Sequence, residues 1–445
     1  MRMAPLLTFY GDDLTGSTDA LEALGLAGLE TVLFVRPPDD QDLHRFAGFQ
    51  AVGLAGTSRS RSPAWMDENL PSAFEWLKRQ GAPLCHYKVC STFDSAPAVG
   101  SIGRALDLGA ACFDQPMTPV VVGVPELRRY TFFGHLFAAY QGEVHRIDRH
   151  PVMSRHPVTP MAEADLCKHL GVQTPKSIGL VDLVTLGGPG LEQVVDSAAE
   201  QSEIVLFDVA DPASQLSVGR QLWRLRRPQG RFVVGSSGVE YALIAAWREA
   251  GLLGMPATFR SPGAVDRIAV VSGSVSPTTE RQIRHAEACG FSLLAQDVDV
   301  LLADDGIARA TSAAMDVLEQ GRSVILASAM GPADARPLEE RARHEIGRRL
   351  GTVLRQLVER AGLTRAVVAG GDTSSHALEE LGVTALTLRL PLPRTPGSPL
   401  CRTHRRDGSE GPDLAFKGGQ IGADDYFVAI RDGIGSADDA AAGGQ

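Results

Sequence analysis

The chain has 445 residues, a length at which one hydrophobic core usually gives way to two domains. Its formal net charge of −10 and scattered basic residues disfavour nucleic acid as a partner, and no apolar run is long enough to span a bilayer. The six cysteines lack CxxC spacing and the density of a disulfide scaffold, so we expect a soluble protein of the reducing cytoplasm without structural zinc.

Short aliphatic and β-branched runs alternate with segments of helical spacing along the first part of the chain. The predicted strands cover residues 6–10, 31–35, 51–54, 120–124 and 204–209. This alternation is typical of mainly parallel sheets with helices on both faces, which predicts an α/β fold. The first run leads directly into two acidic residues and offers no credible cleavage site, so we interpret it as a strand and not as a signal peptide.

A second series of predicted strands follows a stretch of linker composition at residues 254–263. These strands cover residues 268–271, 323–327, 366–369 and 385–390. We therefore predict an N-terminal domain at 1–255 and a C-terminal domain at 264–433. The small and polar residues of 434–445 predict a flexible tail.

The first strand is followed by a turn that carries two adjacent carboxylates, Asp12 and Asp13. In open α/β sheets, ligands bind beyond the carboxyl ends of the strands. A carboxylate in that place suits a general base for a substrate hydroxyl, and Thr15, Ser17 or Thr18 could donate hydrogen bonds or cap the next helix. An ordinary capped turn is the alternative, but it needs only one acid. We therefore favour a catalytic role for this turn.

A second turn carries one cation followed by hydroxyls at the end of another predicted strand. Lys88 would supply a point charge, and Ser91 and Thr92 would donate hydrogen bonds to a carboxylate or phosphate. A surface lysine before an ordinary turn is the alternative. The histidines show no metal-binding spacing, and we single out only His86 and His376, because each lies in or beside one of these turns.

Three further turns in the second half combine glycine, serine and threonine. Small residues let a backbone approach a ligand closely and hydroxyls supply donors, so a phosphate could be held although the GxxxxGK[ST] motif is absent. A lysine in the last of these turns could neutralise developing charge. Plain strand-to-helix turns are the alternative. The predicted nucleotide-binding residues are Ser272, Gly273, Ser274, Ser276, Gly370, Gly371, Asp372, Thr373, Lys417, Gly418, Gly419 and Gly422.

Taken in order, these motifs resemble those of the four-carbon acid sugar kinase family, formerly a domain of unknown function, over nearly the whole chain. The N-terminal family pattern Asp-Asp-x-Thr-Gly-x-x-Asp appears at residues 12–19. A Gly-Ser-x-Ser-Pro turn, a Gly-Gly-acid-Thr-Ser turn and a Lys-x-Gly-x-x-Gly loop appear at 273–277, 370–374 and 417–422. Each motif alone is unremarkable, but four in this order are specific.

The resemblance implies a sugar-acid-binding N-terminal domain, an ATP-binding C-terminal domain and an active-site cleft between them. It also implies Mg²⁺ that enters with ATP and is not held by the protein alone. Asp12 and Asp13 would then lie near the hydroxyl that is phosphorylated. The residues implied to hold the acid are Lys88, Ser91, Thr92 and, by a looser match, Arg129. A small sugar acid and ATP are thus the expected partners, and a homodimer is left open.

Two positions depart from the family pattern Lys-x-Asp-Ser-Thr-x-Arg-Gly-Asn-Ile-Gly. Cys90 stands in place of the acid and Asp94 in place of the arginine, and residues 95–99 are additional. Exchanging a guanidinium for a carboxylate removes a fork-shaped anion clamp and reverses the local charge. The variant motif is similar to that of a branch associated with Rubisco-like decarboxylases, which implies a branched oxo-acid such as 3-oxo-isoapionate as the acceptor.

The sequence therefore predicts an ATP-dependent kinase that phosphorylates a hydroxyl of a tetronate, a 3-oxo-tetronate or 3-oxo-isoapionate in carbohydrate catabolism. A haloacid-dehalogenase-like phosphatase is disfavoured, because Gly11 stands where its nucleophile would be. A non-catalytic nucleotide or sugar-acid sensor is disfavoured, because each half of the chain carries its own set of polar turns. At this stage either Asp12 or Asp13 could be the base.

Overall fold

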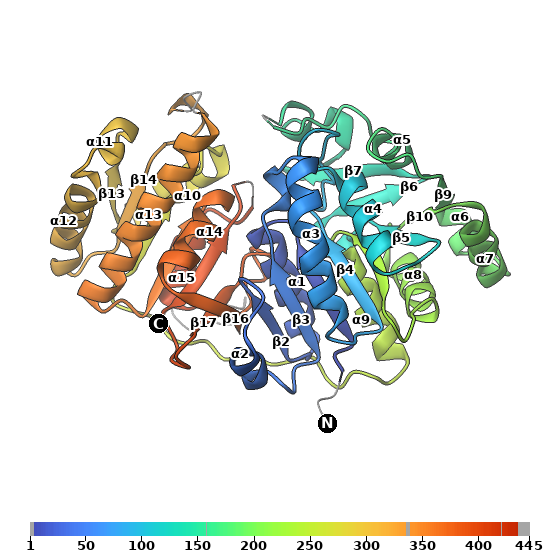
Figure 1. The fold of residues 1–445 in the computed structure, drawn as a ribbon. Helices are drawn as coiled ribbons and strands as arrows, with labels where there is room; N and C mark the ends of the chain where they lie inside the picture. The colour runs from blue at the N-terminus through green and yellow to red at the C-terminus, as the bar shows by residue number, and fades with distance from the viewer. Residues whose placement is uncertain (1–3, 157, 335–338, 420, 435–445) are drawn as a thin grey trace. The chain divides into compact units, whose positions relative to one another are not determined.

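The computed structural model forms two compact units, drawn in Figure 1. The described residues are 4–156, 158–334, 339–419 and 421–434. The first unit contains the residues up to 32 together with 43–257, and the second contains 33–42 together with the residues from 258 onward. The predicted division of the chain did not include the return of 33–42 to the second unit. From residue 435 onward, the predicted tail lies outside the described residues.

The sheet of the first unit is parallel, with strand order β3-β1-β4-β11-β5-β10-β9. Its strands are β1 (Leu7–Gly11), β3 (Ala51–Ala55), β4 (Leu84–Lys88), β5 (Thr118–Val121), β9 (Ile178–Val181), β10 (Ile204–Phe207) and β11 (Arg231–Gly235). Strands β1, β4 and β10 are buried along their whole length, as expected for a parallel sheet covered on both faces. The predicted α/β class is thereby confirmed.

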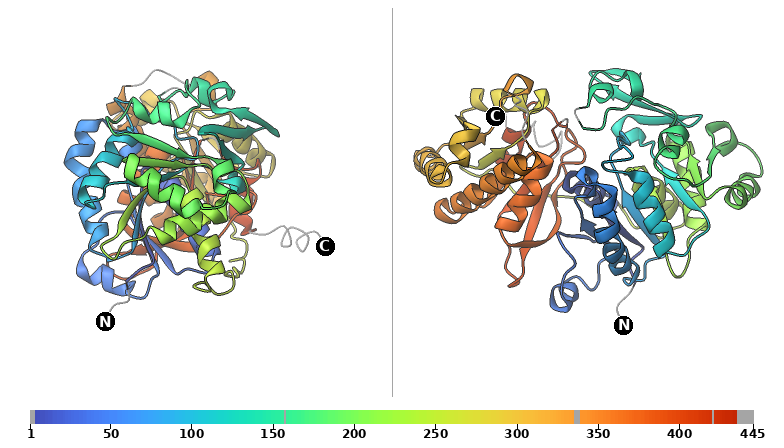
Figure 2. Two further views of the ribbon diagram at one scale, coloured as in Figure 1. Left: turned by 90° about the vertical axis from the view of Figure 1, so that its right-hand side faces the viewer. Right: turned by 45° about the horizontal axis from the view of Figure 1, so that its top comes forward.

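Helices cover both faces of this sheet (Figure 2). Helices α3 and α4 pack together, and α1, α8 and α9 form another packed group. The helices are α1 (Leu14–Leu26), α3 (Pro63–Lys78), α4 (Ile102–Cys112), α5 (Leu166–Gly171), α6 (Leu183–Leu186), α7 (Leu191–Gln201), α8 (Pro212–Arg224) and α9 (Gly238–Glu249). A small antiparallel sheet joins β6 (Arg129–Phe132), β7 (His135–Tyr140) and β8 (Glu143–Arg146).

The sheet of the second unit is parallel at one side and antiparallel at the other. Its order is β13-β14-β12-β15-β18-β17-β16, and β17 and β16 run antiparallel to their neighbours. The last two residues of β2 (Thr31–Phe34) pair with β16. The strands are β12 (Ala269–Ser272), β13 (Ser292–Ala295), β14 (Val324–Ala327), β15 (Arg365–Ala369), β16 (Val383–Leu390), β17 (Leu400–Arg405) and β18 (Asp413–Lys417).

Two groups of helices pack on the sheet of the second unit. Helices α12, α13 and α14 pack in sequence, and α10 packs against α15 around an apolar core that includes Val270, Ile283 and Phe427. The helices are α10 (Pro277–Ala288), α11 (Val298–Leu302), α12 (Gly306–Glu319), α13 (Glu340–Ala361), α14 (Gly371–Glu380) and α15 (Tyr426–Asp432), with α2 (Asp40–Arg45) preceding them in the chain. None of the helices in the described part of the chain is long and apolar enough to cross a bilayer.

Candidate active site

The two carboxylates after β1 and the lysine at the end of β4 are brought together by the parallel pairing of these strands. Gly11 pairs with Lys88, and the Asp12 backbone N–H donates to the Lys88 carbonyl at 2.9 Å. Asp13 is the N-cap of α1, where its carboxylate accepts hydrogen bonds from the Gly16 backbone N–H and the Thr15 hydroxyl. The cap explains why the helix begins here, and it leaves the Asp12 side chain free of this task.

An arginine that the sequence analysis missed completes this group. Arg59 lies in the 3₁₀ turn η1 (Ser58–Ser60) after β3, and its backbone N–H donates to the Asp12 carbonyl. Its Nη1 is 2.8 Å from Asp13 Oδ2, and its Nη2 is 2.9 and 3.1 Å from the two carboxylate oxygens of Asp94. The carboxylate of Asp94 therefore holds a guanidinium supplied by another part of the chain.

Asp12 and Asp13 differ sharply in their affinity for a proton. Burial, reinforced by the charge of Asp13, raises the pKa of Asp12 to about 8. Burial also opposes ionisation of Asp13, but the Arg59 charge and the Gly16 N–H outweigh it and lower the Asp13 pKa below its ordinary value. Asp12 is only 4% exposed, and its Oδ1 has no hydrogen-bond partner among the described residues. Such a separation of neighbouring pKa values is typical of an acid–base pair.

Lys88 is a buried cation that interacts with acidic groups. Its Nζ lies 3.1 Å from Asp19 Oδ2 and donates to the Val89 carbonyl. Burial opposes its charge, but the carboxylates of Asp19 and Glu240 raise its pKa above the ordinary value. A Cβ placed on Gly16 would lie 3.4 Å from this Nζ and 3.6 Å from Asp12 Oδ1, so the glycine keeps the chain close to both groups.

The other predicted acceptor residues lie around the same turns. Thr15 donates to Asp13, which makes it part of the helix cap. Thr92 donates to Asp94 and to the Cys90 sulfur, whereas Ser91 is half-buried in the turn that follows β4.

Arg129 opens β6, and its Nη1 donates to the carbonyls of Leu127 and Ala139. Burial lowers its pKa, and Cys90 lies close enough to interact with its charge. Within the described part of the chain, the Arg129 guanidinium has no carboxylate partner. Its buried Nε also lacks a hydrogen bond there.

His86, which the sequence singled out, is fully buried in β4. Its ring nitrogens lie 2.6 Å from Glu240 Oε1 and 3.1 Å from the Gly235 carbonyl. Both nitrogens are therefore engaged inside the protein, so we assign His86 a structural role.

The predicted nucleotide turns of the second unit also converge. Lys417 is fully buried at the end of β18, and its Nζ donates to Thr279 Oγ1 at 3.0 Å and to the Gly418 and Gly419 carbonyls. The Thr279 hydroxyl in turn lies 3.0 Å from Ser274 Oγ. Burial, aided by the charge of Arg281, lowers the Lys417 pKa to about 7. Thr279 thus links two of the predicted turns, although it was not predicted as a site residue.

Close backbone approaches connect the remaining residues of these turns. The Gly273 N–H donates to Ala369, and a Cβ on Gly273 would lie 2.4 Å from Thr373 Oγ1. Ser276 caps α10, and Ser272 lies at the end of β12. Gly422 has a positive φ of 103° and packs against Gln282. Asp372 lies in α14, but its side chain is outside the described part of the structure.

The glycine pair at the start of α14 allows a matched test of this backbone geometry. Gly370 has φ 115° and ψ 133°, which a side chain rarely tolerates, whereas a Cβ on Gly371 would meet open space. We expect Gly370→Ala to lower the free energy of unfolding by about 1–3 kcal/mol, with Gly371→Ala as the neutral control. Urea denaturation followed by circular dichroism measures both. Equal stability of the two variants would show that alanine at position 370 adopts this conformation without strain.

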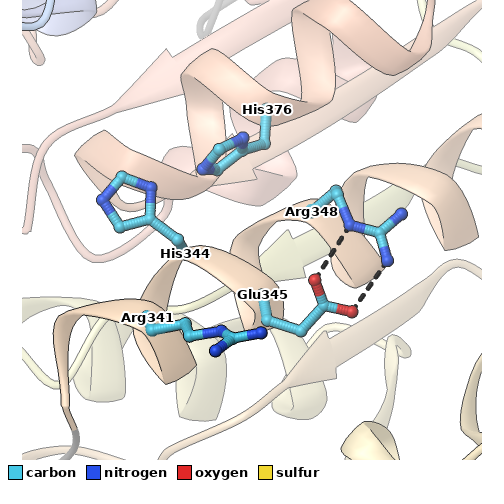
Figure 3. Close-up of a pocket in the computed structure, with 5 residues that line it drawn as sticks. All are labelled: Arg341, His344, Glu345, Arg348 and His376. Carbon is cyan, nitrogen blue, oxygen red and sulfur yellow. Dashed lines mark hydrogen bonds and ion pairs between the residues drawn. The ribbon is translucent and has the colours of Figure 1, made fainter.

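A pocket of about 430 Å³ lies between α13 and α14 of the second unit (Figure 3). The residues that line it are Arg341, His344, Glu345, Arg348 and His376. The Glu345 carboxylate accepts hydrogen bonds from Arg348 and from Arg349, which lower its pKa to about 2. The rings of His344 and His376 are 5.4 Å apart and nearly perpendicular. Arginines outnumber acids in the lining, so the pocket suits an anion, and it shares α14 with the predicted nucleotide turn.

Two family models match consecutive parts of the chain. Residues 7–243 match a sugar-binding N-terminal domain, and residues 269–427 match a nucleotide-binding C-terminal domain. The chain is thus a two-domain α/β protein with one domain of each kind. It belongs to the four-carbon acid sugar kinase family, which confirms the resemblance predicted from the motifs.

Named relatives cover nearly the whole chain. A 3-oxo-isoapionate kinase of Paraburkholderia graminis is 45% identical, over 96% of this chain and 94% of its own length. A 3-oxo-tetronate kinase of Cupriavidus necator is 30% identical, over 95% of this chain and 96% of its own length. A crystal structure from Salmonella typhimurium, described as a putative tRNA synthase, shares the fold with a TM-score of 0.74 and 24% identity, over 95% of this chain and 98% of its own.

Proposed function

We propose that the protein transfers the γ-phosphoryl group of ATP to a hydroxyl of a 3-oxo sugar acid. The observation that carries this proposal is the Asp12 carboxyl directly after β1, which is buried and whose Oδ1 has no hydrogen-bond partner among the described residues. Burial raises its pKa to about 8, within the range that suits a general base. The names of the relatives support a sugar acid as the acceptor. A 45% identical 3-oxo-isoapionate kinase and the carboxylate at position 94 favour the branched acid over a linear tetronate.

Different residues of the first unit deprotonate the acceptor and bind its carboxylate. Asp12 removes the proton of the acceptor hydroxyl, and Asp13 caps α1 and holds Arg59. Lys88 keeps a positive charge beside Asp12. The Arg129 guanidinium, which has no carboxylate partner among the described residues, binds the acceptor carboxylate.

The residues of the second unit fit ATP. Glycines that permit close backbone approach, hydroxyl donors and the buried Lys417 together suit the phosphates. Mg²⁺ is usually bound through the phosphates of the nucleotide with few protein ligands, so it would enter this site together with ATP. When bound, Mg²⁺ neutralises phosphate charge. The protein's task is then to orient the phosphates and exclude water.

An ADP-coupled screen with ATP and Mg²⁺ tests the proposal. The acceptor panel contains 3-oxo-isoapionate, 3-oxo-tetronate and tetronate. We expect acceptor-dependent release of ADP, fastest with 3-oxo-isoapionate. Binding of these acids by calorimetry without any ATP consumption would instead identify a sensor. Release of phosphate from a sugar-acid phosphate in the absence of nucleotide would identify a phosphatase.

A further inference from the structure

Asp94 is a buried carboxylate whose surroundings fix it in one orientation. Both of its oxygens contact Arg59 Nη2, and the hydroxyls of Thr92 and Thr159 also donate to it. Burial alone would raise its pKa, but the Arg59 charge and the hydroxyl donors lower the pKa to about 2. Asp94 is therefore ionised at neutral pH.

The charge of Arg59 is consequently already balanced. Its guanidinium lies between the fixed carboxylates of Asp13 and Asp94, and its side chain is only 27% exposed. A carboxylate of an acceptor would have to displace one of these partners or approach both of them against like-charge repulsion. Arg59 lies beside Asp12, where a guanidinium could bind an acceptor carboxylate. Because it is paired with Asp13 and Asp94, it is nevertheless a poor anion site.

Arg129 is in the opposite situation. It interacts with Cys90, which lies in the same turn as Thr92 and Asp94, but within the described chain its hydrogen bonds go to backbone carbonyls and not to a carboxylate. Of Arg59 and Arg129, only Arg129 has no carboxylate partner among the described residues. An acceptor acid is therefore drawn to Arg129 and not to Arg59.

We propose that Asp94 is a specificity-determining positioning residue, which withdraws Arg59 from the acceptor carboxylate and leaves that role to Arg129. The inference rests on the proposed function and narrows its acceptor class. Because Arg59 contacts the backbone of Asp12 and the side chain of Asp13, an acid held by Arg59 would place its carboxylate next to the base. Asp94 thereby selects against acids that would bind in that way, among them the linear four-carbon acids.

Asp94→Asn tests this directly, because it keeps the size of the side chain and removes the charge. We expect the ratio of kcat/KM for 3-oxo-isoapionate to that for 3-oxo-tetronate to fall about tenfold, the equivalent of one added ionic contact, through a lower KM for the linear acid. Asp94→Glu, which can still hold Arg59, should restore most of the original ratio. The thermal unfolding midpoint of each variant separates these effects from loss of fold.

The double variant Arg59→Ala, Asp94→Asn decides whether Arg59 is responsible. We expect it to show no gain for the linear acid, because the released guanidinium is gone, whereas Arg129→Ala should raise KM for the branched acid. An equal loss for both acids in Asp94→Asn would overturn the proposal, and so would a gain that persists in the double variant.

Calorimetry of both acids without ATP repeats the comparison independently of turnover. A wild-type protein that binds the acids selectively but consumes no ATP would contradict the proposed function and leave the role of Asp94 measurable. Failure of wild type and variants to bind either acid would overturn the role of Asp94 as well.

Discussion

Asp12→Asn is expected to lower kcat about 10²–10⁴-fold, the usual contribution of a general base, with little change in the affinity for ATP. The amide cannot take the proton of the acceptor hydroxyl, and the residues predicted to bind ATP belong to the other unit. Steady-state kinetics for kcat and calorimetry for ATP binding measure the two effects. Retention of more than a tenth of the wild-type kcat would exclude Asp12 as the base.

The pH dependence of kcat/KM is a second test of Asp12 as the base. A base must be ionised, so kcat/KM for the acceptor should rise with pH through the Asp12 pKa, near pH 8. Asp13→Asn is the matched variant, because asparagine still caps α1 but removes the charge that helps to raise the Asp12 pKa. The rising limb should therefore move to lower pH in Asp13→Asn. A limb that stays in place, or moves to higher pH, would contradict the assignment.

Lys417→Met is expected to lower kcat/KM for ATP about 10²–10³-fold, because it removes the buried lysine that we propose neutralises phosphate charge. With a pKa of about 7 in the nucleotide-free protein, Lys417 is mostly neutral at pH 8, and phosphate charge should restore its proton. ATP binding at pH 8 should thus take up about one proton through this residue.

Calorimetry at pH 8 in two buffers of different ionisation enthalpy measures this uptake. The control is Lys168→Met, a largely exposed lysine paired with Asp165 in the first unit. Equal proton uptake by the wild type and by Lys417→Met would show that Lys417 does not face the nucleotide.

Much of the fold could be predicted from hydrophobic patterning. The predicted strands at 6–10, 268–271 and 366–369 lie within one residue of β1, β12 and β15. Strand β5 was predicted about two residues too late, because a proline is typical of a strand boundary. Pro119 nevertheless pairs with Val205 inside the sheet. The small sheet β6–β8 was missed, because its strands are half-exposed and mix charged with aromatic residues.

The site was predictable where it depends on position in the fold. Asp12 follows β1 and Lys88 ends β4, and the pairing of these strands brings the two residues together within the first unit. Within the second unit, the pairing of β15 with β18 brings two of the predicted turns together. Arg59 could not be predicted in this way, because its contact with Asp94 spans 35 positions and its Ser-Arg-Ser surroundings carry no motif. The signal available was charge balance, since a buried carboxylate at position 94 requires a cation from elsewhere.

Phosphorus-31 NMR of a mixture of the protein, ATP, Mg²⁺ and 3-oxo-isoapionate shows directly whether phosphate is transferred from ATP to the acid. We expect a new phosphomonoester resonance that grows in step with ADP and is absent with Asp12→Asn. Formation of ADP with inorganic phosphate alone, or persistence of ATP with every acid of the panel, would contradict the proposed function.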